Sequence, residues 1–444
     1  MTLSSGVPMT VRRVIRLAGL NALFLICLSC GENYRPVATP QAPNPPNPGF
    51  SHIAVVLSSN GGNNPGAATT IDVSGDTAVS ESKTGTSPAY VTLAANGTVV
   101  YVANRGEDTV STFSPTSTAT PTTISLPTGA SPSFVATTQS AAVYVANSGN
   151  NTVSVISTVT NAVTNTVAVG ADPVAMAELP NGTRVYVANA GTGGAGGSLT
   201  SLNTVDFSVN SPLAGVTWVS PAWVVARPDN QRVFVLDKGA GTVTEINTSG
   251  TTDVVMASVP VGVGAEYMIY DSTHSRVYVT NPVSGIVYAL DGSDSAAGSI
   301  SQLAAIPVAG ADSVAALPDG SRFYVAAATV NGTNVSSSAT VIDSSSLTVE
   351  KTIPITTVTQ ACAAFVNTPF ELSIAASGDS TRVYVGNCDA GSTAIIATVA
   401  NGSPGDGSAE DTLVMNMNAP LSAQSPGNGG TPPPQNPVFV VAGP

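Results

Sequence analysis

Charged residues, histidines and cysteines are scarce in this chain. Only 9% of its 444 residues are Asp, Glu, Lys or Arg, and it has two histidines, His52 and His274, and four cysteines. Two imidazoles cannot supply the several ligands of a histidine-rich copper or haem site, and no Cys-x-x-Cys-His haem motif is present. We therefore expect no metal and no cofactor. After residue 30 no segment keeps an apolar period of 3.6 residues, which argues against a helical core.

Basic residues are the scarcer of the two charged classes. Fourteen Lys and Arg face 27 Asp and Glu, which gives a formal charge of −13. A surface of this sign repels phosphate backbones and anionic lipid headgroups. Nucleic acid and direct adsorption to a membrane are therefore excluded as expected modes of binding.

Residues 11–30 are typical of an export signal. Three arginines precede an apolar segment of about a dozen residues, Leu17–Leu28, which is too short to span a bilayer comfortably. The segment ends in Leu28–Gly31, which resembles a bacterial lipobox, and the resemblance implies cleavage before Cys30 and lipid attachment to its sulfur. Cys27 stands where that pattern usually has Leu. An ordinary signal peptide is the alternative.

A Pro-rich segment, residues 36–49, follows the presumed lipid site. Such a segment favours polyproline II, which at about 3.1 Å per residue would hold a folded body roughly 40 Å from the lipid. We therefore divide the chain into a signal peptide (1–29), a lipid-anchored tether (30–49) and a folded body (50–444). The expected location is extracytoplasmic, at the outer membrane or cell surface.

One short motif recurs seven times, with first residues 42 to 60 positions apart. The copies are Tyr101–Asn104, Tyr144–Asn147, Tyr186–Asn189, Phe234–Asp237, Tyr278–Asn281, Tyr324–Ala327 and Tyr384–Asn387. A period in the forties made of strand-like segments is the signature of a propeller blade. The chain resembles the YVTN-type β-propeller repeat proteins, and Tyr278–Asn281 spells their motif. Similar blades occur in propeller lactonase-like proteins.

Each repeat predicts four antiparallel strands and therefore an all-β fold with a single propeller. In residues 131–170 the expected strands are Phe134–Thr137, Val143–Ala146, Thr152–Ile156 and Thr164–Val169. The alternation in Thr152–Ile156 is the period of two that a strand with two different faces shows.

The two ends of the body complete one another. Residues 53–57 and 69–73 look like the second and third strands of a unit without its first strand, and residues 436–442 match the first strand at 220–226. A C-terminal inner strand that joins the N-terminal blade would close the ring and remove an open sheet edge. This gives eight blades, with seven as the alternative.

The irregular loops are expected on one face, which we call the top face: it carries the loops between the second and third strands of each blade and those between blades. Cys362, in the long loop 356–370, and Cys388 both lie there. In an oxidising compartment they are expected to form a disulfide, with two free thiols as the alternative.

Five aromatic residues occupy equivalent positions in the predicted inner strands. They are Tyr90, Phe134, Trp223, Tyr267 and Phe439. They are candidates to line the mouth of the central channel and stack on a sugar or another flat ligand. The alternative is packing between neighbouring blades, where bulky side chains fill the wedge.

Charged residues also recur in register. Five arginines precede second strands and are expected on the bottom face: Arg184, Arg232, Arg276, Arg322 and Arg382. Six acids are expected in top loops: Glu107, Asp108, Asp172, Asp237, Asp312 and Asp389. Either the ring is polarised, or these charges serve solubility and protection of strand edges.

No catalytic residue can be assigned, because no Gly-x-Ser-x-Gly or other nucleophile motif occurs. We expect a monomeric, non-catalytic binding or scaffold propeller at the bacterial cell envelope, whose partner is an envelope protein or a glycan. The alternative is a lactonase-like hydrolase that uses the propeller channel. A cluster of Glu, His and Arg converging on the channel would favour the enzyme.

Overall fold

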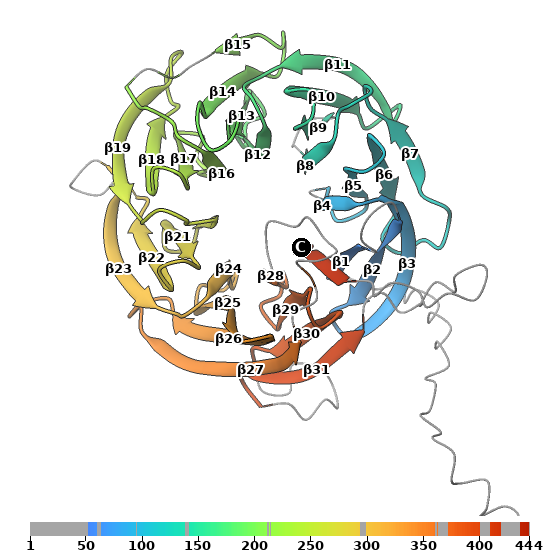
Figure 1. The fold of residues 1–444 in the computed structure, drawn as a ribbon, viewed down its shortest axis with the longest axis vertical. Helices are drawn as coiled ribbons and strands as arrows, with labels where there is room; N and C mark the ends of the chain where they lie inside the picture. Colours follow the sequence, from blue (N-terminus) through green and yellow to red (C-terminus); the bar gives the residue numbers. More distant parts are fainter. Residues whose placement is uncertain are drawn as a thin grey trace, which may run out of the picture. The chain divides into compact units, whose positions relative to one another are not determined.

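All the named strands of the computed structural model belong to eight four-stranded antiparallel sheets, arranged as blades around a ring (Figure 1). The structure describes residues 52–59, 64–94, 96–137, 142–210, 213, 215–293, 299–359, 362, 372–399, 409–418 and 436–443. The chain divides into two compact units, Met1–Ala42 and Pro43–Pro444, and every described residue belongs to the second. No helix among these residues is long and apolar enough to cross a membrane.

The strands fall into four classes by their distance from the ring axis. The innermost strands are β32 (Asn436–Ala442), β4 (Pro88–Leu93), β8 (Pro132–Thr137), β12 (Pro173–Glu178), β16 (Pro221–Ala226), β20 (Tyr267–Asp271), β24 (Ala311–Ala316) and β28 (Leu372–Ala376). The second strands are β1 (Ile53–Ser59), β5 (Val100–Asn104), β9 (Ala142–Asn147), β13 (Arg184–Asn189), β17 (Arg232–Asp237), β21 (Arg276–Asn281), β25 (Arg322–Asn331) and β29 (Arg382–Asn387).

The two outer classes complete the blades, which we number 1 to 8 in this order. The third strands are β2 (Pro65–Asp72), β6 (Thr109–Phe113), β10 (Thr152–Ser157), β14 (Ser198–Asn203), β18 (Thr242–Asn247), β22 (Ile286–Asp291), β26 (Asn334–Asp343) and β30 (Ser392–Ala397). The outermost are β3 (Thr77–Thr86), β7 (Thr122–Ser125), β11 (Ala162–Ala168), β15 (Val209–Asn210), β19 (Val254–Pro260), β23 (Ser301–Pro307), β27 (Val349–Thr359) and β31 (Thr412–Asn418).

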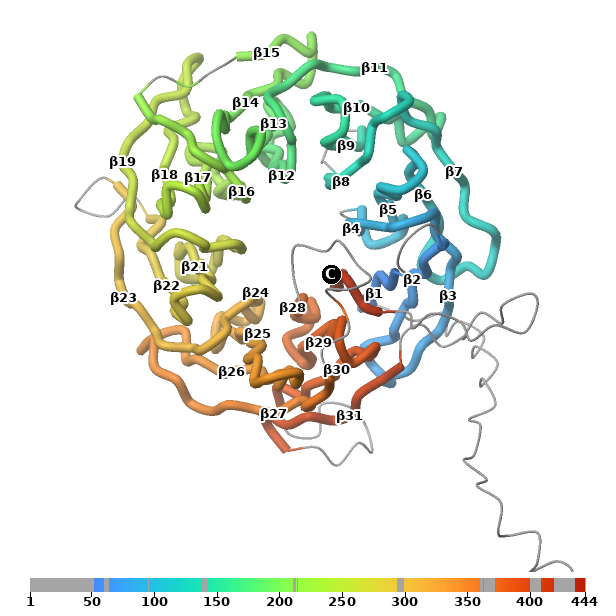
Figure 2. Tube along the Cα trace, in the orientation of Figure 1, coloured from blue at the N-terminus to red at the C-terminus, as the bar shows by residue number. Residues whose placement is uncertain are grey.

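The ring closes through its C-terminal strand, as the sequence predicts. β32 pairs antiparallel with β1, with Val55 opposite Val441 and Leu57 opposite Phe439. Figure 2 shows this last strand beside the first strands of the chain, so that blade 1 contains both ends of the body. The prediction of eight blades is confirmed, and seven, the alternative, is wrong.

The recurring motif ties the second strand to its neighbours. Its tyrosine is almost fully buried, as for Tyr144 and Tyr186. Its asparagine ends the strand, and in blade 3 the side-chain amide of Asn147 donates to the hydroxyls of Thr152 and Ser154 at 3.0 and 2.8 Å. A buried amide with these partners satisfies its donors and fixes the turn to the third strand.

Four of the five regularly placed arginines link neighbouring blades on the bottom face, whereas Arg232 pairs with Glu245 within blade 5. Arg184 of blade 4 pairs with Asp253, in the β18–β19 loop of blade 5, and the Tyr186 hydroxyl donates to the same carboxylate at 2.8 Å. Equivalent pairs are Arg322–Asp411 and Arg382–Asp76. These ion pairs join neighbouring blades, a role that the sequence pattern did not indicate.

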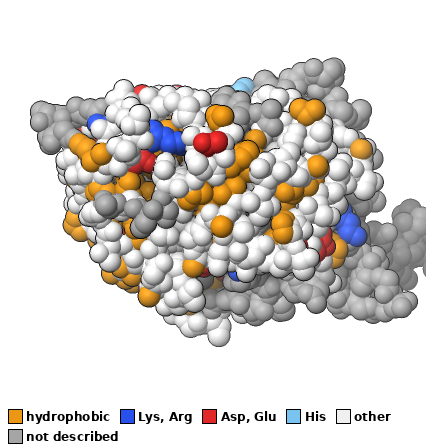
Figure 3. All heavy atoms as spheres, turned by 90° about the horizontal axis from the view of Figure 1, so that it is seen from above, with side chains coloured by type: hydrophobic (Ala, Val, Ile, Leu, Met, Phe, Trp, Pro, Cys, Tyr) orange, Lys and Arg blue, Asp and Glu red, His pale blue; other side chains and the backbone are white. Residues whose placement is uncertain are grey.

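The outer wall of the ring carries few charges. In the side view of Figure 3, apolar side chains lie scattered among polar ones, and Lys, Arg, Asp and Glu are sparse. Single exposed apolar residues such as Val159 and Val283 are common on folded proteins and mark no site by themselves.

Candidate ligand-binding site

The five aromatic residues singled out in the sequence lie together in the central channel. Tyr90 stacks on Phe134 with ring centroids 4.0 Å apart and lies 4.3 Å from Phe439, and Trp223 lies 4.7 Å from Tyr267. Tyr90 of blade 2 also lies 6.3 Å from Trp223 of blade 5, although two blades separate them. The cluster therefore crosses the channel, which packing between neighbouring blades alone would not produce, and it forms a floor.

A local distortion of the inner strands accompanies three of these rings, Tyr90, Phe134 and Trp223. In β4, β8 and β16 the first residue is proline, and the register shifts between that proline and the aromatic residue two positions later. A bulge of this kind re-aims the side chain that follows it. Blade 4 has the small, buried Ala175 at the equivalent position, which leaves room for Tyr90 and Trp223 to approach one another.

The phenols of the floor stay neutral. Burial raises the pKa of Tyr267 to about 12 and raises the pKa of Tyr90 well above its usual value of 10.0. Both hydroxyls therefore remain hydrogen-bond donors across the physiological range.

A cavity of about 620 Å³ is lined by three of these aromatic residues and by the top-face loops of blades 2 to 6. Figure 1 shows where these blades lie in the ring. Tyr90, Phe134 and Trp223 contribute its aromatic surface. Its charged residues come from the top loops, and they are Arg105, Asp172, Lys238 and Glu266. This size and this mixture of apolar surface and a few polar groups are typical of small-molecule sites.

A glycine-rich turn forms one wall of the cavity. Gly191 has a φ of +79°, and a Cβ there would lie 2.3 Å from the carbonyl oxygen of Ala195, so only glycine fits. Gly193 and Gly194, further along the turn, line the cavity without side chains. The loop that looked irregular in the sequence therefore brings bare backbone to the site.

Asp172 differs from the other top-face aspartates. Asp108 accepts hydrogen bonds from the backbone N–H groups of Gly129 and Ser131, both at 2.7 Å, and Asp237 accepts them from Val219 and Ser220. Asp312 and Asp389 likewise accept backbone hydrogen bonds. The Asp172 carboxylate makes no hydrogen bond or ion pair with any residue that the structure describes.

The electrostatic environment of Asp172 is set by burial and by two cations. Burial raises the pKa of its carboxyl, and the positive charges of Arg105 and Lys238 act in the opposite direction. Neither cation forms an ion pair with it. A carboxylate of raised pKa in a cavity, flanked by cations that it does not touch, is a candidate functional group.

Arg105 and Lys238 are unusual among the basic residues of the described chain. Six of the others form ion pairs or hydrogen bonds on the bottom face or within a blade: Arg184, Arg227, Arg232, Arg276, Arg322 and Arg382. Lys83 and Lys351 are exposed on outer strands. Arg105 and Lys238 immediately follow second strands on the top face, and both line the same cavity.

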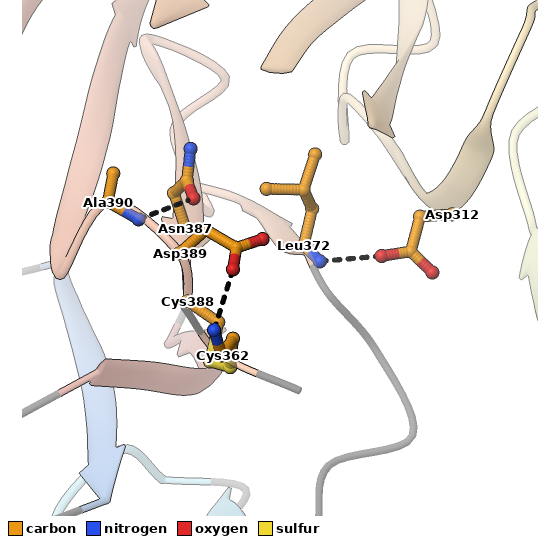
Figure 4. The surroundings of a disulfide bond; sticks show 7 residues. All are labelled: Asp312, Cys362, Leu372, Asn387, Cys388, Asp389 and Ala390. Carbon is orange, nitrogen blue, oxygen red and sulfur yellow. Dashed lines mark hydrogen bonds between the residues drawn. A yellow bond between two sulfur atoms is a disulfide. The ribbon is translucent and has the colours of Figure 1, made fainter. Parts of the chain in front are cut away.

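The disulfide lies on another part of the top face. Cys362 and Cys388 are bonded, with Cα atoms 5.5 Å apart, and Asp389 accepts a hydrogen bond of 2.7 Å from the Cys362 N–H (Figure 4). Both belong to blade 8 and its preceding loop, whereas the cavity is lined by blades 2 to 6. Much of the loop 356–370, like Cys30, lies outside the described residues.

Neither histidine contributes to the cavity. The His274 ring pairs with Asp271 at 3.0 Å on the bottom side of blade 6, and His52 lies 3.9 Å from Asp379. No group of three or more His, Cys, Asp or Glu side chains within the described segments is arranged to hold a metal ion. Of the three residue types that would favour an enzyme, Glu and Arg converge on the channel and His does not.

We call the four charged residues that line the cavity the charged wall: Arg105, Asp172, Lys238 and Glu266. Sequence reasoning missed most of them. Arg105, Lys238 and Glu266 were not identified as site residues, and Asp172 was counted only as one of several loop acids. The available signal was that Arg105 and Lys238, unlike the periodic arginines, directly follow a copy of the recurring motif.

The chain is similar to a known family in sequence and to known proteins in structure. The model of the family described as lactonase, 7-bladed beta-propeller, matches residues 77–330. No curated protein matches the sequence. AztD from Citrobacter koseri has a similar structure, with a TM-score of 0.60 and 11% identity over 88% of this chain and 97% of that one.

A second solved structure is similar over nearly the same extent. It is a candidate 6-phosphogluconolactonase from Bacteroides fragilis, with a TM-score of 0.52 and 13% identity, covering 90% of this chain and 99% of that one. At these identities both likenesses show the fold alone.

Proposed function

The chain belongs to the lactonase, 7-bladed β-propeller family, and from this premise we propose that it binds a small polar molecule with one flat apolar face in the top-face cavity. The matched segment runs from β3 to β25, and the eight blades described here exceed the seven in the family's description. The observation that carries the proposal is the Asp172 carboxylate, which makes no hydrogen bond or ion pair with a described residue and lines one cavity with Arg105, Lys238 and the aromatic floor.

The floor and the wall favour different parts of such a ligand. A ring stacked on Trp223 or Phe134 buries apolar area and gains the geometry-specific attraction of aromatic contacts. Polar groups at the edge of the ligand can meet the charged side chains, which are stronger hydrogen-bonding partners than neutral groups. This is a non-catalytic binding function on a rigid scaffold, and the cavity's size suits one small molecule better than a polymer.

A cavity-filling variant tests the proposal. Purified protein is screened for thermal stabilisation by sugars, sugar lactones and amino acids, because a ligand that binds only the folded state raises its melting temperature. Ala222 lines the cavity, so Ala222→Phe should abolish the stabilisation. Val159→Phe, at an exposed turn, adds the same ring elsewhere and should leave it intact. Equal stabilisation of both variants would reject this cavity as the site.

Lactone hydrolysis is a second candidate, favoured by the family and by the state of Asp172. A carboxylate whose pKa is raised by burial is a stronger general base for a water molecule that attacks a lactone carbonyl. Arg105 or Lys238 would stabilise the oxyanion that forms, and the ring C–O bond would then break as the Asp172 carboxyl returns its proton to the leaving alkoxide. Turnover of a sugar lactone by the wild type, lost in Asp172→Asn while the compound still binds, supports hydrolysis. Binding without turnover in the wild type leaves the protein a binding propeller.

The location remains a proposal built on the N-terminal sequence. The lipobox resemblance supports lipid attachment at Cys30 and a monomer tethered at the bacterial envelope, and the recurring motif supports the YVTN-type repeat relationship. Envelope proteins or glycans are then the expected neighbours. Cys30→Ser should release the protein from membranes or block its processing, and unchanged fractionation and mass would argue for an ordinary signal peptide or none.

A further inference from the structure

Resting on the proposed function, we propose that the ligand is a zwitterion, a free α-amino acid with a flat side chain. Its carboxylate would lie between Arg105 and Lys238, its ammonium group would face Asp172, and its side chain would stack on the Trp223 floor. The proposal follows from the sign and the placement of the charges around the cavity and from the lack of ion pairs among Asp172, Arg105 and Lys238.

Asp172, Arg105 and Lys238 line this cavity without forming ion pairs with one another. Arg105 and Lys238 influence Asp172 through space, yet neither forms an ion pair with it or with another residue that the structure describes. Arg105 donates only a long hydrogen bond of 3.3 Å, to the Ser131 hydroxyl. Opposite charges held apart across a cavity form an electric field that a dipole aligned with it would stabilise.

The balance of charge favours a zwitterion over a simple ion. The wall has two cations, Arg105 and Lys238, and two acids, Asp172 and Glu266. A monoanion would gain from the cations but face the repulsion of Asp172, and a monocation would meet the opposite problem. A molecule that carries one charge of each sign can place both favourably, as matching potentials across an interface require.

The shape of the cavity limits the size of the ligand. Its volume of about 620 Å³ accommodates an amino acid or a very short peptide, and the side-chain-free Gly193 and Gly194 leave space along one wall. The aromatic cluster crosses the channel below, so the open side of the site is the top face. A flat side chain would pack against the aromatic cluster of Tyr90, Phe134 and Trp223.

A matched set of probes separates the two charges. Isothermal titration at neutral pH would compare L-phenylalanine with L-phenylalaninamide, which lacks the carboxylate, and with N-acetyl-L-phenylalanine, which lacks the ammonium group. The amino acid should bind about tenfold or more tightly than either derivative, because each loses a charge-assisted contact.

Variants then assign each charge to its partner. Asp172→Asn should weaken phenylalanine binding about tenfold but should not weaken N-acetylphenylalanine binding, because that probe has no ammonium group and is repelled by the Asp172 carboxylate. Lys238→Gln should weaken phenylalanine binding similarly but should not weaken phenylalaninamide binding, because that probe has no carboxylate and is repelled by the Lys238 ammonium group. Lys351→Gln, which removes the same charge from an outer strand, should alter no affinity. Melting temperatures check that each variant is folded.

The outcomes distinguish this inference from the proposed function. Equal binding of the three probes, or losses in Asp172→Asn that do not depend on the ammonium group, would overturn the zwitterion assignment. If a sugar or lactone binds in the cavity and phenylalanine does not, the zwitterion inference fails while the proposed site stands. If Ala222→Phe leaves phenylalanine binding intact, the amino acid binds elsewhere and the assignment fails.

Discussion

Arg382 and Asp76 form a buried ion pair between residues 306 positions apart in the chain. The Arg382 Nε donates to both oxygens of Asp76 at 3.0 Å, and one Nη donates to Oδ2 at 2.9 Å. Arg382 begins β29 in blade 8, and Asp76 lies in the β2–β3 turn of blade 1. The pair therefore joins the last blade to the first at the point where the ring closes.

Removing one member of this pair should strongly destabilise the ring. Arg382→Ala leaves the Asp76 carboxylate buried without its partner, and breaking a buried pair in this way typically costs about 3–5 kcal/mol. Urea unfolding of the two proteins measures the difference. Arg105→Ala, which removes a cation that makes no ion pair with a described residue, is the control and should cost less than about 1 kcal/mol. A similar small cost for Arg382→Ala would refute the closing role.

The strand pairing at the same seam supports a second prediction. Removing residues 436–444 takes away β32, exposes the edge of β1 and removes Phe439 from the aromatic floor. The truncated chain should melt at a clearly lower temperature and lose cavity binding. A synthetic peptide of residues 436–444 should restore both by adding the missing strand. A truncated chain that melts like the wild type would show that closure does not depend on β32.

The architecture was predictable because it repeats. Each copy of the recurring motif carries the same strand pattern, and the match between residues 436–442 and 220–226 identified the closing strand. The aromatic candidates could be named for the same reason, since they share one register position. What aligned strands could not show is that the prolines before Tyr90 and Trp223 precede bulges, which turn the rings across the channel.

The charged wall was harder to predict, because a cation follows only two of the seven motif copies. Asp172 and Asp237 both look like acids of top-face loops in the sequence. The sequence does not show whether such a carboxylate accepts hydrogen bonds from backbone N–H groups, as Asp237 does, or makes none with a described residue, as Asp172 does. The position of Lys238 after a motif copy places it on the top face, but it does not show that Lys238 and Arg105 line one cavity.

Removing the disulfide should lower the stability of the protein and leave ligand binding unchanged. Cys362 and Cys388 are 26 residues apart, and closing a loop of that size stabilises the folded state by about 3–4 kcal/mol in the chain-entropy model. Replacing both by serine should lower the melting temperature. Ligand binding should be unchanged, because the cavity is lined by blades 2 to 6. Non-reducing peptide mapping tests the bond itself, and two free thiols in the exported protein would contradict it.

Substitution by asparagine should change the melting temperature in opposite directions at Asp172 and at Asp237. Because burial raises the pKa of Asp172 above its ordinary 3.8, the folded state binds that proton more tightly than the unfolded chain does. Ionisation of Asp172 therefore weakens the folded state as the pH rises from 3.8 through the raised pKa. Asp172→Asn removes this cost, so the variant should melt above the wild type at pH 7, with the difference vanishing toward pH 3.

Asp237→Asn provides the contrast. The Asp237 carboxylate accepts hydrogen bonds from the N–H groups of Val219 and Ser220, and the amide of asparagine has only one oxygen to accept them. That variant should melt below the wild type at pH 7. Scanning calorimetry of the three proteins between pH 3 and 8 measures both effects. A residue whose removal stabilises the fold is typical of a site kept for function at the expense of stability. A lower melting temperature for Asp172→Asn at pH 7 would instead assign Asp172 a structural role like that of Asp237, and the case for the cavity would lose its central observation.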